Sequence, residues 1–209
     1  MVVGAGGFAR EVLDVIEAIN SLDDQWAILG LVADPPPGAE HAQRCRHAYL
    51  GGVDVLTDLD CQVVIGIGNG TVRRRLDEQI TAMGREAATF VHPSVTMGAK
   101  VELGSGTVLC AGVRITTNVT LGRHCHINLN STVGHDARLG DYVTVNPLVA
   151  VSGNASLGTE TTVGTGAAIL EGRRTGERCT VGAGAVLTKD CGDDQTLVGI
   201  PARPLAPAR

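Results

Sequence analysis

The chain has 209 residues, a formal net charge of −5, 28 glycines and only two Phe, two Tyr and one Trp. It has no basic run, which argues against nucleic acid or an anionic membrane as a partner. No apolar run approaches the roughly 20 residues of a membrane span, and the N-terminus lacks the regions of a signal peptide. The six cysteines show no paired close spacing, which predicts a reduced, cytoplasmic protein.

Residues 1 to 91 read as strands and helices in alternation, the pattern of a small α/β domain with a parallel sheet. We predict strands at 1–3, 26–33, 63–67 and 87–91, and helices at 8–19 and 71–83. A polar loop follows the second strand. The first strand is unusually short, which leaves open a start codon further upstream.

A glycine turn, Gly4-x-Gly6-x-x-Ala9, follows the first strand and opens the first helix. This geometry presents backbone N–H groups and a helix N-terminus to a phosphate, although such a turn can also serve only close packing. A dinucleotide site expects an acidic residue about 20 residues further on. Asp34 lies beyond that distance, and so small a domain holds only half of such a fold. A mononucleotide or nucleotide-sugar is therefore favoured over NAD.

Residues 95–187 repeat every six residues without an insertion. One series, at every sixth residue from Met97 to Leu187, is aliphatic or Met except at Thr175. A second series, two residues before each of these, is small or β-branched except at Arg173. A fixed period marks a repeat architecture. Residues at i and i+2 share one face of a short strand, so three hexads close a triangular coil and residues eighteen apart stack. Each coil buries its inward residues only against its neighbours.

Glycines recur at the same eighteen-residue spacing, at Gly104, Gly122, Gly140, Gly158 and Gly176. Glycine tolerates positive φ, so we expect these residues to form tight corners.

The hexads resemble those of the left-handed parallel β-helix in hexapeptide acyltransferases. That fold is an exception to the right-handed crossover rule, so its handedness is taken from the family. Five motifs in order resemble the bacterial sugar acetyltransferases that make acetamido sugars on nucleotide carriers, a group that includes the sialic acid O-acetyltransferases. They are residues 4–10 (GAGGFAR), 67–69 (IGN, with Arg73), 91–94 (VHPS), 133–136 (VGHD) and 198–202 (VGIPA).

The resemblance implies a Rossmann-like half-domain at residues 1–91 that binds a nucleotide-sugar. A left-handed parallel β-helix with a C-terminal closing segment then occupies residues 92–209. In the family, a His-acidic pair after a glycine corner supplies the catalytic base, which implies His135 with Asp136. The amide that receives the thioester oxygen lies one coil further on, at Gly153.

The family also implies the binding residues. The nucleotide-sugar is held by Gly6, Gly7 and Asp34, with the turn at Gly68 and Asn69 closing the uridine side. Coenzyme A runs along later coils, near Thr165, Gly166, Ala183 and Gly184. Some members carry a second His nine residues after the base, where this chain has Thr144.

The predicted activity is transfer of acetyl from acetyl-CoA to the amine of a nucleotide-linked amino sugar, by direct attack and without a metal. Two alternatives stay open: a sugar O-acetyltransferase of the sialic acid type, and a non-catalytic β-helix used for assembly. We expect a homotrimer, because a corner His needs a second wall to enclose the pantetheine arm. Cys125 takes an inward slot, so we expect His124 and His126 to be outward surface groups and not metal ligands.

Overall fold

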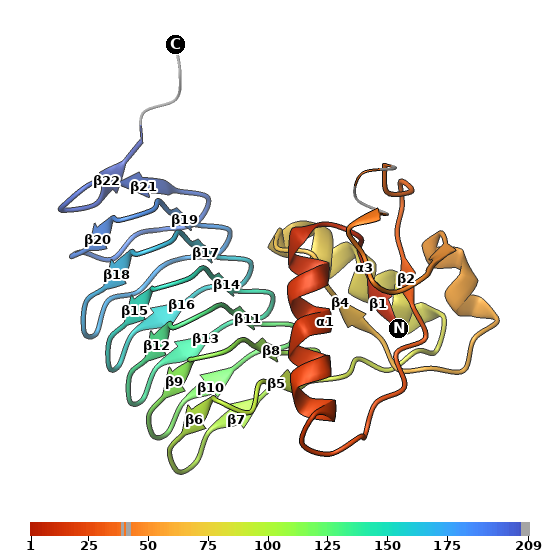
Figure 1. The fold of residues 1–209 in the computed structure, drawn as a ribbon. Coiled ribbons are helices and arrows are strands. Elements are labelled where there is room, and N and C mark those ends of the chain that lie inside the picture. Colours follow the sequence, from red (N-terminus) through yellow and green to blue (C-terminus); the bar gives the residue numbers. More distant parts are fainter. Residues whose placement is uncertain (39, 41–42, 206–209) are drawn as a thin grey trace.

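The computed structural model describes residues 1–38, 40 and 43–205, which fall into two parts (Figure 1). The first part is a small sheet flanked by helices. The second is a tall prism of stacked coils, which the chain climbs from one end to the other. The last four residues of the second predicted domain lie outside the described residues.

Four parallel strands form the sheet of the first part, in the order β3-β2-β1-β4. Its elements are β1 (Val2–Val3), α1 (Gly7–Asn20), β2 (Leu31–Val32), β3 (Tyr49–Gly51), a 3₁₀ helix (Val53–Thr57), β4 (Val64–Ile65) and α3 (Gly70–Ala82). Successive residues of a strand point to opposite faces of a sheet. Val2 therefore packs in a cluster with α1, and Val3 packs in a cluster with α3.

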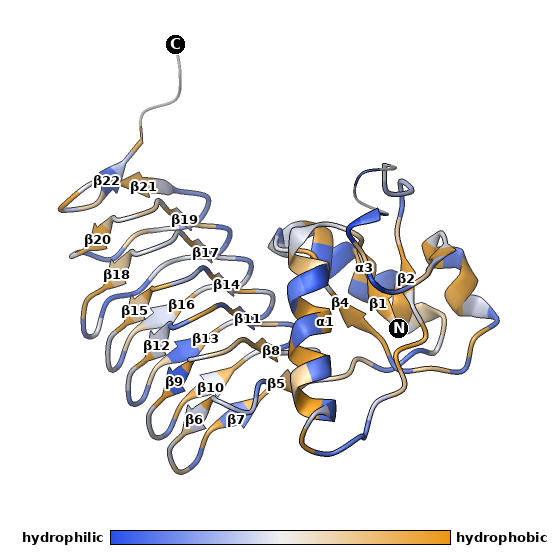
Figure 2. Ribbon diagram, in the orientation of Figure 1, coloured by the Kyte–Doolittle hydropathy of each residue, from blue (hydrophilic) through white to orange (hydrophobic). Residues whose placement is uncertain are grey.

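Both predicted helices are confirmed, as α1 and α3. Their apolar stripes cover the two faces of this sheet (Figure 2). The strands are shorter than predicted, and β3 was missed inside the expected polar loop. The predicted strand at 87–91 survives only as β5 (Phe90–Val91), and it pairs with the prism and not with the first sheet. Ala87 alone keeps a bridge to Val63. One short segment therefore belongs to both parts.

Three sheets form the faces of the prism, and their strands are one coil apart. The first face holds β5, β8 (Val108–Leu109), β11 (His126–Ile127), β14 (Thr144–Val145), β17 (Thr162–Val163), β19 (Thr180–Val181), β21 (Thr196–Val198) and β22 (Arg203–Pro204). The second face holds β6 (Thr96–Met97), β9 (Arg114–Ile115), β12 (Thr132–Val133), β15 (Ala150–Val151), β18 (Ala168–Ile169) and β20 (Val186–Leu187). The third face holds β7 (Glu102–Leu103), β10 (Thr120–Leu121), β13 (Arg138–Leu139) and β16 (Ser156–Leu157).

The register confirms the eighteen-residue coil of a parallel β-helix. Leu121 pairs with Leu139, and Leu139 pairs with Leu157. Most residues of the two predicted inward series lie in one continuous core, which holds mainly Val, Leu, Ile and Ala. Met97, the first residue expected to point inward, is instead 44% exposed. The count changes only near the end, where Val181 pairs with Leu197 in a sixteen-residue coil. The antiparallel strand β22 then closes the first face.

The explanation predicted for the recurring glycines is wrong. Gly104 and Gly158 do not have positive φ; a Cβ on either would lie 2.4 Å or less from backbone of the next coil. Glycine is needed there because two coils approach closely. The left-handed conformation occurs elsewhere, at the second residue of many corners, for example Asn118, Asn130 and Asn154.

The expected exposure of His124 and His126 is also wrong. Both side chains point away from the prism core, as predicted, but they are buried. The first part of the chain covers this stretch of the first face. Nε2 of His124 lies 2.9 Å from Oδ1 of Asp77 on α3, and the ring of His126 packs against Phe8 at the start of α1. The hexads predict which way a side chain points but not what lies outside the coil.

Candidate active site

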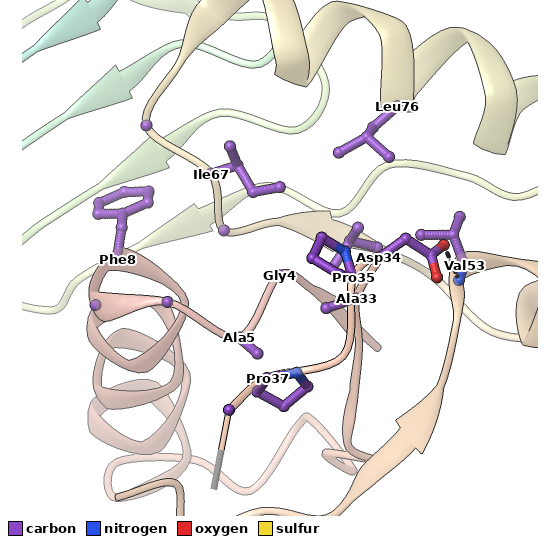
Figure 3. A pocket seen from close by; sticks show the side chains of 16 residues that line it. Gly4, Ala5, Phe8, Ala33, Asp34, Pro35, Pro37, Val53, Ile67 and Leu76 are labelled. Carbon is purple, nitrogen blue, oxygen red and sulfur yellow. Dashed lines mark hydrogen bonds between the residues drawn. The ribbon is translucent and has the colours of Figure 1, made fainter. Parts of the chain in front are cut away.

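A cleft of about 450 Å³ opens at the carboxyl ends of β1, β2 and β4 (Figure 3). Parallel α/β sheets bind ligands at this edge, where the strand order reverses. Gly6 is the N-cap of α1, and Gly7 begins the helix. The first-turn amides of α1 therefore border the cleft and suit a phosphate. Among the predicted binding residues, Gly6, Gly7, Asp34 and Gly68 all line this cleft.

Asp34 follows β2 at the mouth of the cleft. Its Oδ2 accepts a hydrogen bond from the Val53 N–H over 2.9 Å (Figure 3). A Cβ at Gly52 would lie 2.7 Å from the other carboxylate oxygen. The carboxylate is thus fixed against the start of the 3₁₀ helix, with its position set by the backbone and not by an ion pair.

A second cleft, of about 540 Å³, lies between the first part and the first face of the prism. Phe8 and Gly68 line both clefts, so the two are neighbours. Asn69 lines the second cleft, and its side chain caps α3 by accepting from the Val72 N–H over 3.0 Å. The predicted turn therefore stands between the nucleotide cleft and the prism.

Polar residues of the first face form the far wall of the second cleft. Asn128 and Asn146 follow the strands β11 and β14 and stack one coil apart, with Thr144 beside them. The sequence prediction missed both asparagines. Their spacing was visible in the sequence, but only the docked first part of the chain makes this face a cleft wall.

Arg73 fixes the two clefts to the prism. Its buried guanidinium donates to the backbone oxygens of Gly68 and Tyr142 and to the hydroxyl of Thr144. Burial lowers the pKa of Arg73 to about 10, so it is charged at neutral pH. Thr144 in turn donates to the Gly68 oxygen over 2.8 Å. The IGN turn and the wall of the second cleft are therefore one hydrogen-bonded unit.

His126 lies at the base of the second cleft, with its ring 4.6 Å from that of Phe8. Burial, together with the charge of Arg73 and the neighbouring His124, holds its pKa well below the ordinary histidine value. The ring is consequently neutral at physiological pH. Neither ring nitrogen has a hydrogen-bond partner among the described residues.

The predicted catalytic residues lie apart from both clefts, at the corner between the second and third faces. Nδ1 of His135 donates to Oδ2 of Asp136 over 2.9 Å, which leaves Nε2 free to accept a proton. This hydrogen bond holds the pKa of Asp136 below its ordinary value. The two side chains are about half exposed, at 51% and 47%. The arrangement is that of a histidine base oriented by a carboxylate.

Gly153 lies directly under the imidazole. A Cβ at Gly153 would meet Cε1 and Nε2 of His135 at 2.6 Å, so the ring position depends on glycine there. The Gly153 N–H makes no hydrogen bond to any residue that the structure describes. A free amide beside the base can bind a developing oxyanion.

The residues predicted for coenzyme A occupy the corner between the first and second faces. Thr165 with Gly166, and Ala183 with Gly184, are the same turn one coil apart. A Cβ at Gly166 or Gly184 would meet nothing within 4 Å, so an open strip runs along this corner. The second face separates this strip from His135. One chain therefore does not bring the predicted donor site and the predicted base together.

No group of three or more His, Cys, Asp or Glu side chains that could hold a metal occurs among the described residues. In the same residues, no helix is both long and apolar enough to cross a bilayer.

The comparisons with known proteins agree with this geometry. The family described as "PglD N-terminal domain" matches residues 1–80. The GDP-perosamine N-acetyltransferase of Escherichia coli O157:H7 is 36% identical over 77 residues, which cover 37% of this chain and 35% of that enzyme. The chain thus spans about a third of the length of this curated relative.

Several solved structures match almost the whole chain, among them two with bound ligands. The acetyltransferase domain of PglB from Neisseria gonorrhoeae FA1090, in complex with acetyl coenzyme A, has a TM-score of 0.89 and 28% identity, over 98% of this chain and 97% of that one. PerB from Caulobacter crescentus, in complex with CoA and GDP-perosamine, has a TM-score of 0.90 and 27% identity, over 98% and 96%.

An α/β half-domain joined to a parallel β-helix, with a histidine at a coil corner, defines a hexapeptide-repeat acyltransferase. Within that class, the chain is similar to sugar N-acetyltransferases, in sequence over its first 80 residues and in structure over 98% of its length.

Proposed function

We propose that the protein transfers the acetyl group of acetyl-CoA to the amine of a nucleotide-linked amino sugar, with His135 as general base. The observation that carries the proposal is the corner at which His135, oriented by Asp136, lies over the free amide of Gly153. The relatives named above are N-acetyltransferases of such sugars, or bind CoA and GDP-perosamine. The two adjoining clefts match an acceptor with a nucleotide end and a sugar end.

The reaction is a direct transfer. The sugar nitrogen attacks the thioester carbon while Nε2 of His135 takes a proton from that nitrogen. The Gly153 N–H stabilises the negative charge on the former carbonyl oxygen. A C–N bond forms, the C–S bond breaks, and His135 returns the proton to the leaving sulfur. The products are an N-acetyl sugar nucleotide and free coenzyme A.

The acceptor binds with its phosphates at the N-terminus of α1. Gly6 and Gly7 let the phosphates approach the helix amides, Asp34 holds the nucleoside, and the turn at Gly68 and Asn69 closes over it. The amino sugar then extends past Phe8 into the second cleft, because Phe8 and Gly68 border both.

The site is completed by other copies of the chain, in a homotrimer. The outward side chains of the second face become small towards the C-terminal coils, at Ala150, Ala168 and Val186. The outward side chains of the third face are Glu102, Thr120, Arg138 and Ser156, two of which are charged. Three copies that meet on their second faces bring His135 of one copy against the Thr165 and Ala183 corner of the next. Coenzyme A then lies between two copies.

The test is a transfer assay with acetyl-CoA and a panel of amino sugars linked to GDP, UDP, dTDP and CMP, with the product analysed by mass spectrometry. The expected product gains one acetyl group that survives mild alkali, as an amide does. An alkali-labile acetyl ester would show O-acetylation instead. Absence of transfer to every acceptor would leave the β-helix as an assembly module.

The variant Gly6→Val isolates the acceptor site. A Cβ at Gly6 meets nothing within 4 Å, so the fold accepts a larger residue while the cleft loses room for phosphate. The KM for the sugar nucleotide should rise far more than the KM for acetyl-CoA. Equal effects on both would contradict the assignment of the cleft.

A further inference from the structure

Leu148 is an unusual residue for its position at a corner of the prism. The second residue of this turn is Gly112, Asn130, Leu148, Gly166 and Gly184 in successive coils, and every one has positive φ. Glycine and asparagine adopt this left-handed conformation readily, but leucine does so at a cost. Leu148 has a φ of 62°. Among the described residues it is the only aliphatic side chain in this conformation.

Three other bulky residues with positive φ have partners that hold them. Tyr142 donates its hydroxyl to Asp77, Glu160 accepts from Thr71, and Arg178 pairs with Asp194. Leu148 is instead 62% exposed in the single chain. A strained backbone that supports an exposed apolar side chain points to a role for that side chain outside the chain's own core.

The position of Leu148 suggests that role. The open strip beside Gly184 and Gly166 runs down the corner, and the next coil in that direction presents Pro147 and Leu148. The Gly166 N–H donates to the Pro147 oxygen, which fixes the two turns in contact. Pro147 also lines the second cleft. Leu148 therefore stands where the strip ends and the sugar cleft begins.

We propose that Leu148 is the end stop of the acyl-donor groove and restricts the donor to a short acyl group. This inference rests on the proposed function, in which pantetheine lies along the strip and its thioester meets the amine at the second cleft. The acyl group points past the thioester, towards Leu148. Replacing the side chain by hydrogen would lengthen the groove by about one coil, roughly 4.8 Å.

The experiment compares wild type with Leu148→Gly, using one sugar nucleotide acceptor and the CoA esters of acetate, propionate, butyrate and hexanoate. Wild type should strongly prefer acetyl-CoA. In Leu148→Gly, the ratio of kcat/KM for butyryl-CoA to that for acetyl-CoA should rise about tenfold or more, the range expected for one or two methylenes in an apolar pocket. Glycine suits the conformation, so the variant should fold.

Asn130→Gly is the matched control, because it makes the same backbone change one coil below. It should leave the acyl preference unchanged. Leu148→Ala, which keeps the Cβ and removes the branched end of the side chain, should shift the preference in the same direction as Leu148→Gly.

Each other outcome has one reading. An unchanged acyl preference in both Leu148 variants would overturn the proposal, and a weakened oligomer in addition would show that Leu148 only packs between copies. A wild-type enzyme that transfers no acyl group to any acceptor would instead remove the proposed function on which the inference rests.

Discussion

The guanidinium of Arg73 donates to the backbone oxygen of Tyr142 over 2.7 Å and so ties the helix α3 to the prism. The same side chain also bonds the oxygens of Ile67 and His124. A single cation thus satisfies several buried carbonyls from two distant stretches of chain. A lysine could not do so, since it has fewer donors and no planar fork.

Arg73→Met should therefore destabilise the protein strongly. Each buried carbonyl that loses its donor costs about 1–3 kcal/mol, so we expect a loss of about 3 kcal/mol or more in the free energy of unfolding, measured in urea. Arg75→Met is the control, because Arg75 lies on the same helix and is exposed. Similar losses in the two variants would show that the buried bonds of Arg73 contribute little.

Gly153→Ala should damage catalysis and spare the fold. The new methyl group would overlap the His135 ring, which can swing outward because it is half exposed. A displacement of about 1 Å at a reacting group can cost about 10²-fold in rate, and we expect kcat to fall by that order. Gly192→Ala serves as control, since a Cβ there meets no atom closer than 4.0 Å. Wild-type kcat in Gly153→Ala would show that the ring position is unimportant.

His135→Ala should lower kcat by about 10² to 10⁴, the usual contribution of a general base, with little change in acetyl-CoA affinity. Asp136→Asn should cost less, because it removes the orienting carboxylate but keeps a hydrogen-bond acceptor near Nδ1. The measurement is kcat from pH 6 to 8, with acetyl-CoA binding followed separately. A kcat near that of wild type throughout this range would return His135 to a surface corner residue.

Ala150→Arg should break the oligomer and the activity together. It places a long charged side chain in the middle of the second face, where copies are proposed to meet. Wild type should have three times the 21.6 kDa mass of one chain in solution. The control is Thr120→Arg, which makes a like change on the exposed third face. A fully active monomer, in wild type or variant, would refute the shared site.

Asp77 should govern stability in acid. Burial alone would raise its pKa, but hydrogen bonds from His124, Arg123 and Tyr142 outweigh burial and hold the pKa well below the ordinary value. The ionised Asp77 carboxylate therefore stabilises the folded state fully above its unfolded pKa of about 3.9. This stabilisation is lost as pH falls towards the lower pKa of the folded state.

For wild type this predicts a steep fall in Tm below about pH 5. Asp77→Asn should lower Tm at pH 7 and flatten this acid dependence. Asp24→Asn, at an exposed position, should do neither. An acid profile of Asp77→Asn parallel to that of wild type would show that other carboxylates set it.

The sequence predicted the prism almost residue by residue, because the hexads state directly which side chains face inward. Leu121, Leu139 and Leu157 stack as expected. The hexads could not reveal what covers the prism from outside, since that depends on long-range docking. His124 and His126 were misjudged for this reason, and Asn128 and Asn146 were missed.

The candidate site, like the fold, was predicted only in part. The family resemblance implied that His135, Asp136 and Gly153 lie together, and they do. The glycine turn, Asp34 and Gly68 also share one cleft, as the family resemblance implied. Their function remains a prediction. The prediction that residues 87–91 join the first sheet was wrong, because apolar character alone does not say which of two sheets a short segment joins.

The eighteen-residue register also bears on how the chain folds. Parallel sheets usually fold slowly, because strands distant in sequence must come together, at a cost in chain entropy, before their hydrogen bonds can form. In the prism, each strand instead finds its partner a single coil away, as Thr144 finds Thr162. Closing a loop of so few residues costs little entropy. Once one coil has formed, folding can proceed by adding the adjacent coils one at a time. The slow step should lie in the small N-terminal sheet, where Val2 must pair with Val64. The architecture with more strands is thus the faster to assemble.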